Sequence, residues 1–330
     1  MSPSRERLDA EAAATGFDAA TLEKIAFLLA VLEGVNRHPL LKGRLALKGG
    51  TALNLFAADV PRLSIDVDLN YVGDPDLADM QARRPDVERA IQAVCEREGL
   101  QLRKVPGEHA GGSWILTYHS AYGGTQNLKF DVVFMYRVPL WPVQIRDSRP
   151  VGGIQATDIA VMDDHELAAG KLVALLARSA ARDLFDTHLL LRSGSLDYER
   201  LRVAFVVYGG MSRKDWRRVD SSSLRGDALD LERNLLPLLR TVERSALTDF
   251  DAWAETLVTE ARKAIAPVLP LRPAEVSFLN HLLDEGEIRP ELLTGDATLA
   301  GNIRTHPGLA WKALNVKQHL ISGRSTGDSG

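Results

Sequence analysis

Cysteine is almost absent from this chain of 330 residues, which contains only Cys95. A single cysteine cannot form a disulfide within the chain, so a disulfide framework is excluded and a reducing compartment such as the cytoplasm is expected. Cys95 lies within an apolar helical pattern, which is typical of a small buried residue rather than a nucleophile. The chain also lacks the apolar segment of a signal peptide, and it has no run of about 18 apolar residues, so we expect no membrane association.

An excess of positive charge is also missing. The 40 Lys and Arg residues face 44 Asp and Glu residues, which leaves a formal net charge of -4. The net charge of the chain therefore does not indicate a nucleic-acid partner, although a local basic patch stays possible. The hydrophobic content of 45% is that of a globular protein, and the length allows one large domain or two ordinary ones.

Hydrophobic periodicity divides the chain near residue 155 into a mixed α/β part and a helical part. In residues 1–155 the patterns predict helices over 20–36, 51–58 and 86–98, and strands over 45–47, 63–71, 100–105, 114–120 and 127–135. Glycine and proline between the last three strands favour an antiparallel meander. The expected fold class is therefore α+β, with the sheet confined to the first part.

Helical patterns dominate the second domain, which we place at residues 156–321. Two helices are expected from residue 163 onward, and others over 227–240, 249–264, 273–284 and 306–321. Only the run 203–208 retains some strand character. Residues 322–330 are small and polar, and we expect a disordered tail there.

Two consecutive glycines stand at the predicted strand-to-helix turn. Glycine lets a backbone approach a ligand closely, and backbone N–H groups at such a turn can cradle a polyanionic triphosphate. Gly49 and Gly50 fit this role, and Thr51 adds a hydroxyl group.

Three aspartates accompany the glycine turn. Asp66 and Asp68 are two positions apart in a predicted strand, which puts both carboxylates on one face, and Asp131 interrupts the apolar run NLKFDVVFM. A carboxylate in apolar surroundings is costly unless it is paired or bound to metal, and magnesium prefers such hard oxygen ligands. Each feature alone is weak, because Lys129 can pair with Asp131 and an Asp-x-Asp is often a solvated edge. The combination predicts a metal-dependent phosphoryl or nucleotidyl transfer site.

The segments LKGGTALNLF and PRLSIDVDLNY resemble the AbiEii/AbiGii and MenT family of nucleotidyltransferase toxins, within the polymerase-beta-like superfamily. The similarity extends through NLKFDVVF to the stretch that contains RDLFD, over roughly residues 45–190. It implies a nucleotidyltransferase fold, with a small mixed sheet flanked by helices and followed by a helical C-terminal domain. It implies Mg²⁺ (or Mn²⁺) as cofactor and an NTP as substrate.

The resemblance also implies roles for individual residues. The triphosphate would contact the turn at Lys48, Gly49, Gly50 and Thr51. The metal would bind Asp66, Asp68 and Asp131, and Asp131 would also be the general base. The family's Arg-x-Ser corresponds to Arg62 and Ser64, which brace the strand in the alternative interpretation.

The helical part supplies a second group in the resemblance. Lys171 would reach the triphosphate, and Arg182 and either Asp183 or Asp186 would hold Lys171 or orient the nucleotide. The alternative is that these aspartates pair with Arg178 or Arg182 along the helix.

The resemblance implies transfer of NMP from an NTP to the 3′ acceptor end of tRNA, which would block aminoacylation and translation, and it implies a separate antitoxin protein as partner. Transfer to a protein or to a small molecule such as an aminoglycoside is the alternative reaction. A non-catalytic regulatory module is the alternative class. The segment SRKDWRR, with Trp216 among Arg213, Lys214, Arg217 and Arg218, is either an RNA-phosphate patch or a solvated helix face with a packed tryptophan.

Overall fold

The computed structural model describes residues 3–57, 62–105, 111–151, 153–192, 194–245 and 247–325. The chain forms two compact units that alternate along the sequence. The first comprises Met1–Arg137, Pro142–Asp163 and Leu229–Trp253, and the second comprises Val138–Trp141, Asp164–Ala228 and Ala254–Gly330. The sequence places one boundary near residue 155, whereas the chain returns to the first unit at residue 229. Each unit is described by itself.

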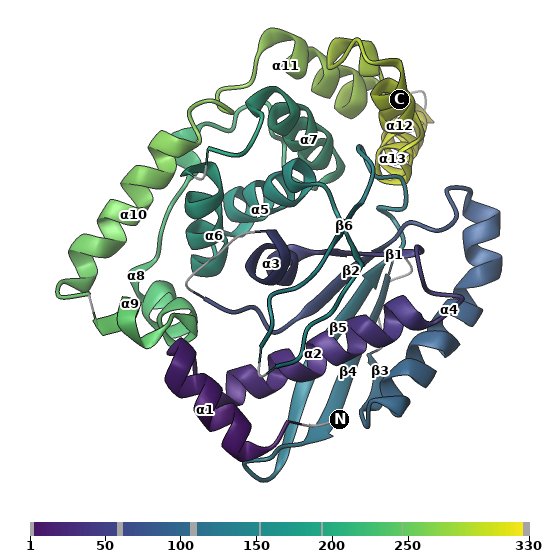
Figure 1. Cartoon of the computed structure of the whole chain (residues 1–330). Helices are drawn as coiled ribbons and strands as arrows, with labels where there is room; N and C mark the ends of the chain where they lie inside the picture. The colour runs from purple at the N-terminus through teal and green to yellow at the C-terminus, as the bar shows by residue number, and fades with distance from the viewer. Residues whose placement is uncertain are drawn as a thin grey trace. The chain divides into compact units, whose positions relative to one another are not determined.

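A seven-stranded mixed sheet forms the centre of the first unit, with the strand order β3-β4-β5-β2-β1-β7-β6 (Figure 1). The strands are β1 (Leu45–Lys48), β2 (Val67–Tyr71), β3 (Gln101–Val105), β4 (Gly111–His119), β5 (Thr125–Val133), β6 (Gln144–Arg146) and β7 (Ile159–Val161). The antiparallel meander β3-β4-β5 confirms the sequence prediction. The sheet is mixed because β2 pairs parallel with β5 and antiparallel with β1, while β1 pairs parallel with β7. Strands β6 and β7, of three residues each, are too short for the periodicity to reveal.

Amphipathic helices cover this sheet. Helix α2 (Ala19–Arg37) runs across the sheet in Figure 1, and it packs against α4 (Leu77–Arg97) and β7. Asp18 and Asp76 cap the two N-termini through their carboxylates, an interaction that stabilises a helix by about 1 kcal/mol. The remaining helical segments of this unit are α1 (Arg5–Thr15), α3 (Gly49–Ala52), η1 (Leu53–Ala57), η3 (Leu231–Leu235), η4 (Leu236–Leu238) and α9 (Thr241–Ser245).

The two elements on either side of the glycines differ in extent from those predicted from the sequence. The strand expected over 63–71 begins only at Val67, because the hydroxyl of Thr51 donates to the carbonyl of Asp66 and so holds the preceding segment away from a strand pairing. The helix expected over 51–58 begins two residues earlier, at Gly49, and continues as the π-helical turn η1. Residue 58 lies outside the described residues.

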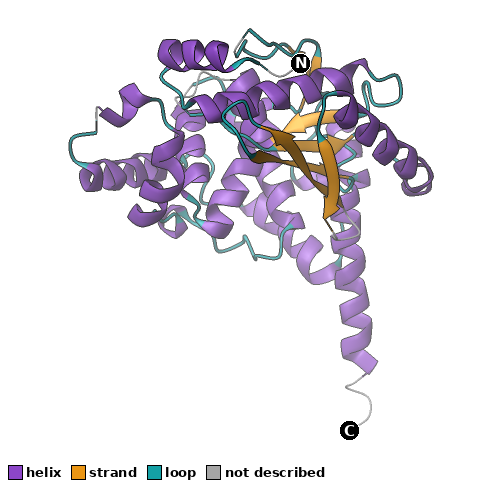
Figure 2. Ribbon diagram, turned by 90° about the horizontal axis from the view of Figure 1, so that it is seen from below, coloured by secondary structure: helices purple, strands orange, loops and turns teal. Residues whose placement is uncertain are grey.

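The second unit is helical, and Figure 2 shows the strands gathered in one sheet. Its main contacts join α5 (Asp164–Arg178) to α6 (Ala181–Arg192) and to α7 (Tyr198–Met211). The other elements are η2 (Ser221–Ser223), α8 (Ala228–Asp230), α10 (Phe250–Ala264), α11 (Pro273–Asn280), η5 (His281–Glu285), η6 (Pro290–Leu292), α12 (Ala297–Thr305) and α13 (Pro307–Ser325); α8 and α10 cross the division between the units.

The expectation that residues 203–208 have strand character is wrong, because these residues lie in the middle of α7. Helix α7 is buried on several sides, so its apolar residues are nearly continuous and their helical period is hidden. Helix α13 runs to Ser325 and so includes the first residues of the expected tail, while residues 326–330 lie outside the described residues. In the described part of the chain, no helix is both long and apolar enough to cross a membrane.

Candidate active site

The glycine turn joins β1 to α3 in a conformation that only glycine adopts easily. Gly49 has φ +74°, and a Cβ added there would lie 2.6 Å from Oδ2 of Asp68. The missing side chain therefore lets the Asp68 carboxylate approach the backbone of the turn. At Gly50, an added Cβ would lie 2.7 Å from Oγ of Ser64 and 3.3 Å from Nη2 of Arg62. Both positions are therefore closely packed, and Gly49 also has the left-handed backbone that favours glycine.

Thr51, Ser64 and Arg62 form the support of this turn. Thr51 is fully buried, and its hydroxyl donates to the carbonyl of Asp66 at 2.6 Å. Ser64 and Arg62 are also buried, and Arg62 donates to the Leu63 carbonyl at 3.0 Å. The observed contacts thus tie the glycine turn to the segment that carries Asp66.

Four polar residues form one row across the sheet. The strand register pairs Lys48 with Asp68, Asp68 with Asp131, and Asp131 with Ser113. Directly paired positions share a face of the sheet, with Cβ atoms about 5 Å apart. The row therefore brings one ammonium, two carboxylates and one hydroxyl together from four strands. Asp66 lies just before β2, two residues from Asp68.

The charges of this row are coupled to one another. Burial raises the pKa of the Asp68 carboxyl, Lys48 opposes this shift, and the neighbouring carboxylates of Asp66 and Asp131 add to it. The Asp68 carboxylate accepts no hydrogen bond from the described part of the chain. Burial also lowers the pKa of Lys48, against the effect of Asp68 and Asp131. An additional cation among these carboxylates would relieve their mutual repulsion.

Asp131 has partners of its own. Its Oδ1 accepts from the Ser113 hydroxyl at 2.5 Å, and its Oδ2 lies 2.5 Å from Nζ of Lys129. The hydrogen bond to Asp131 raises the pKa of Lys129. Sequence reasoning considered Lys129 as a partner but missed Ser113, which precedes the predicted strand and carries no motif. Only the register of β4 on β5 places this hydroxyl beside the carboxylate.

The donor set fits a divalent cation such as Mg²⁺. Asp66, Asp68 and Asp131 offer carboxylate oxygens, the ligand type that Mg²⁺ and Mn²⁺ prefer. Burial raises the pKa of Asp68, and Asp66 and Asp131 add to this effect, which a bound cation would oppose. These three residues would hold the metal, as the sequence predicts.

The second unit contains the other predicted group, on α5 and α6. Lys171 is 13% exposed, and its Nζ lies 3.1 Å from Oδ1 of Asp183 and 2.8 Å from Oδ2 of Asp186. Asp183 also accepts from Arg178, with the Nη2 atom 2.6 Å from Oδ2. Both aspartates are buried, whereas Arg182 is exposed on α6. The structure therefore brings Lys171, Asp183 and Asp186 together within this unit and leaves Arg182 out of their ion-pair cluster.

The two aspartates differ in their partners. Asp183 pairs with two cations, Lys171 and Arg178. The pair with Arg178 agrees with the alternative interpretation, in which the aspartate has a structural role. Asp186 pairs with Lys171, with Oδ2 at 2.8 Å from Nζ.

The basic segment around Trp216 is built as a packing unit. Trp216 is 1% exposed and meets the ring of Phe205 edge-on, with centroids 5.5 Å apart. Arg217 pairs with Asp215 and Asp284, at 2.7 Å and 2.5 Å. The buried tryptophan and the paired arginine favour the packed-tryptophan interpretation. Arg213, Lys214 and Arg218 are exposed.

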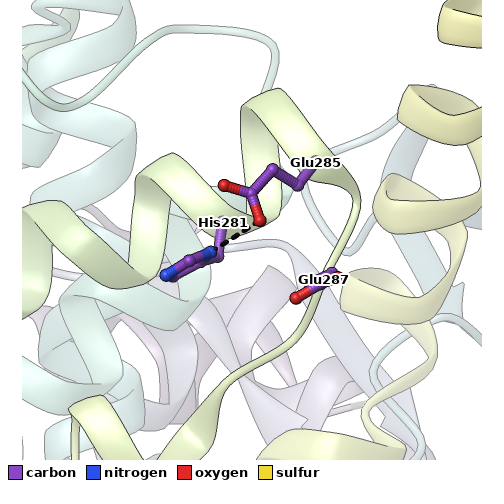
Figure 3. A group of neighbouring side chains, drawn as sticks. All are labelled: His281, Glu285 and Glu287. Carbon is purple, nitrogen blue, oxygen red and sulfur yellow. Dashed lines mark hydrogen bonds and ion pairs between the residues drawn. The ribbon is translucent and has the colours of Figure 1, made fainter.

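A histidine and two glutamates form a separate cluster at the end of η5 (Figure 3). Nδ1 of His281 lies 2.8 Å from Glu285, and the ligand atoms of His281, Glu285 and Glu287 lie within 4.8 Å of one another. Arg289 already pairs with Glu287 at 2.6 Å. This cluster is therefore explained by ion pairs on an exposed surface.

The sheet is mixed, a glycine turn follows its strand β1, and the next two strands in the sheet, β2 and β5, carry carboxylates. This arrangement is a nucleotidyltransferase-like fold. Residues 30–276 match the family described as nucleotidyl transferase AbiEii toxin, type IV TA (toxin–antitoxin) system. The chain belongs to this family of nucleotidyltransferase toxins, which confirms the resemblance drawn from the glycine and Asp-x-Asp segments.

One solved structure with the same fold is MenT4, the nucleotidyltransferase toxin Rv2826c from Mycobacterium tuberculosis H37Rv. The TM-score is 0.54 at 20% sequence identity, over 91% of this chain and 94% of that one. No curated protein matches the chain.

Proposed function

We propose that this chain transfers a nucleoside monophosphate from an NTP to an acceptor hydroxyl, with a divalent metal held by Asp66, Asp68 and Asp131. The acceptor oxygen attacks the α-phosphorus and forms a new P–O bond. The bond from the α-phosphorus to the bridging oxygen of the β-phosphate breaks, and pyrophosphate leaves. Asp131 takes the proton of the acceptor hydroxyl. The metal supplies neutralisation of the phosphate charge.

The observation that carries this proposal is the row of Lys48, Asp68 and Asp131 directly beside Gly49. The open backbone of the glycine turn receives the triphosphate, and Lys48 adds a positive charge at the same end of the sheet. Nucleotidyl transfer is mainly a matter of positioning and charge neutralisation, which is what this arrangement offers.

We further propose that Lys171 and Asp186 take part in the reaction. The resemblance to the toxin family carries this assignment, together with the burial of an ammonium between two carboxylates. In this role Lys171 binds the nucleotide, and Asp183 and Arg178 fix the position of the lysine.

The acceptor that we propose is the 3′ end of tRNA, and the regulatory partner is an antitoxin protein. The toxin–antitoxin family supports the antitoxin partner, and the resemblance drawn from the sequence motifs supports the tRNA acceptor. Nucleotide added at the tRNA terminus prevents aminoacylation and so stops translation.

The test is incubation of the purified full chain with each α-³²P NTP, MgCl₂ and total bacterial RNA. An Asp66→Ala variant serves as the inactive control, and circular dichroism of both proteins verifies folding. Label in RNA of tRNA size, absent with Asp66→Ala, supports the whole proposal and identifies the nucleotide.

Other outcomes separate its parts. Label on protein or on a small molecule such as an aminoglycoside keeps the transferase chemistry and rejects tRNA. Absence of label in every fraction, with folded protein and with Mn²⁺ as well as Mg²⁺, rejects catalysis and supports a regulatory module.

A further inference from the structure

Residues 212–218, which follow α7, form a segment that other elements of the second unit hold in place. The buried ring of Trp216 packs against Gly209 of α7, where an added Cβ would lie 3.1 Å from Cγ of the tryptophan. From α13, Nζ of Lys312 donates to the carbonyl of Ser212 at 2.9 Å. The backbone of the segment is therefore fixed before any ligand binds, which lowers the entropic cost of binding.

The carboxylates near this segment are already engaged. Arg217 pairs with Asp215 and Asp284, and it also donates to Oδ1 of Asn280 at 3.1 Å. The hydrogen bond from Arg217 lowers the pKa of Asp215. Asp220 caps η2, where its carboxylate accepts from two backbone N–H groups at 2.9 Å and 3.2 Å. Arg217 thus has a structural role, and it neutralises acidic groups on this side of the unit.

The other basic side chains of the segment are exposed. Arg213 and Arg218 are exposed and form no ion pair with any residue that the structure describes. Nζ of Lys214 donates to the carbonyl of Leu176 at 2.8 Å, near the end of α5, and Arg178 at that end is 66% exposed. Cations from the segment and from α5 therefore gather on one surface, although the whole chain has a net charge of -4.

The segment offers positive charge without an exposed aromatic ring. Trp216 is 1% exposed, and Nζ of Lys214 lies 5.4 Å from the centroid of its ring. Single-stranded nucleic acid usually stacks its bases on exposed aromatic rings, and a protein interface usually has an apolar centre. Guanidinium and ammonium groups on a fixed backbone instead suit phosphate oxygens, and double-helical RNA is recognised mainly by its shape and its backbone.

We propose that Arg213, Lys214 and Arg218, together with Arg178, bind the phosphate backbone of double-helical RNA. The choice of RNA rests on the proposed transfer to the 3′ end of tRNA, since the stem that precedes this end is a double helix. Trp216 holds the binding groups in place and does not touch the RNA. Contacts to phosphate release counterions, so this binding depends strongly on salt and little on base sequence.

The test is fluorescence anisotropy of the full chain with a fluorescein-labelled RNA hairpin, in EDTA and without NTP, so that no catalytic step takes part. The double variant Arg213→Gln/Arg218→Gln removes two phosphate contacts. Its affinity should fall about tenfold, and the slope of log K against log salt concentration should become shallower by about 2.

A matched control removes the same charge elsewhere. Arg233 and Lys263 are also exposed and form no ion pair within the described part of the chain. Arg233→Gln/Lys263→Gln should keep the affinity within about twofold and leave the salt slope unchanged. Equal losses in the two double variants would show an effect of net charge alone and overturn the proposal. Failure of the parent protein to bind the hairpin saturably, or equally tight binding of a single-stranded RNA of the same length, would also overturn it.

The radiolabel assay separates this inference from the proposed reaction. Arg213→Gln/Arg218→Gln should raise the KM for tRNA about tenfold and leave the KM for NTP unchanged. Labelled RNA with an unchanged KM for tRNA would keep the transferase reaction and reject this surface. Hairpin binding that depends on the two arginines, without any labelling by the parent protein, would keep the surface and reject the reaction.

Discussion

Asp68 and Asp131 are register partners on the parallel strands β2 and β5, so two carboxylates lie side by side on one face of the sheet. Their mutual repulsion is the physical reason that we propose a bound cation on this face. The pKa of Asp68 is raised by burial first and by Asp66 and Asp131 in addition, with Lys48 as the opposing influence.

Substitution of Asp68 should separate function from stability. A carboxyl whose folded pKa is raised stabilises the fold when protonated, and this contribution is lost as the pH rises through the folded pKa. The ionised form is therefore unfavourable in the metal-free protein at pH 7. Asp68→Asn should raise the melting temperature of the metal-free protein by a few degrees, the effect of about 1 kcal/mol.

The same variant should lose nucleotidyl transfer by about 10² or more, because a metal ligand is gone. Differential scanning calorimetry in EDTA and the radiolabel assay measure the two effects. MgCl₂ should stabilise the parent protein and have little effect on Asp68→Asn. A variant that is less stable in EDTA than the parent would show that the aspartate is a structural partner of Lys48 instead.

Gly49 offers a matched comparison with Gly43. Both have positive φ, +74° and +73°, but an added Cβ would meet Oδ2 of Asp68 at Gly49 and nothing within 4 Å at Gly43. Each alanine substitution should cost about 1 kcal/mol for the left-handed backbone alone. Gly49→Ala should cost more than Gly43→Ala in chemical unfolding, and only Gly49→Ala should abolish transfer. Equal costs and equal activities would remove the packing argument for the glycine turn.

Lys171 and Arg178 both pair with Asp183 but differ in exposure. Lys171 is 13% exposed, while Arg178 is 66% exposed. Lys171→Ala removes a cation that two buried carboxylates share, so it should destabilise the chain by about 3 kcal/mol. Arg178→Ala should cost less than about 1 kcal/mol, as exposed ion pairs usually do. Urea unfolding of the two variants measures this difference, and similar costs would contradict the assignment of Lys171 as the central cation.

Cys95 should be chemically inert in the folded protein. It is fully buried, and burial raises its pKa to about 12, so almost no reactive thiolate exists at pH 8. A thiol reagent such as 5,5′-dithiobis(2-nitrobenzoate) should react only after denaturation in guanidinium chloride. Rapid labelling of the native protein at pH 8 would mean that α4 opens easily.

Much of the fold could be read from local sequence pattern. The meander β3-β4-β5 followed from apolar runs separated by turn residues, and helices such as α2 and α5 followed from their periodicity. The failures have local causes too. The short strands β6 and β7 have no periodicity of their own, and α7 loses its period because it is buried on several sides.

By itself, the sequence determined which residues to expect at a nucleotidyltransferase site. They are glycines that free a backbone and aspartates that must be paired or metal-bound in apolar surroundings. Only the tertiary structure decided which groups meet. The register places Ser113 and Lys48 beside the two central carboxylates, and the packing of Trp216 on α7 fixes the segment that carries the exposed arginines. Strand register and packing depend on contacts between distant residues, which no short stretch of sequence encodes.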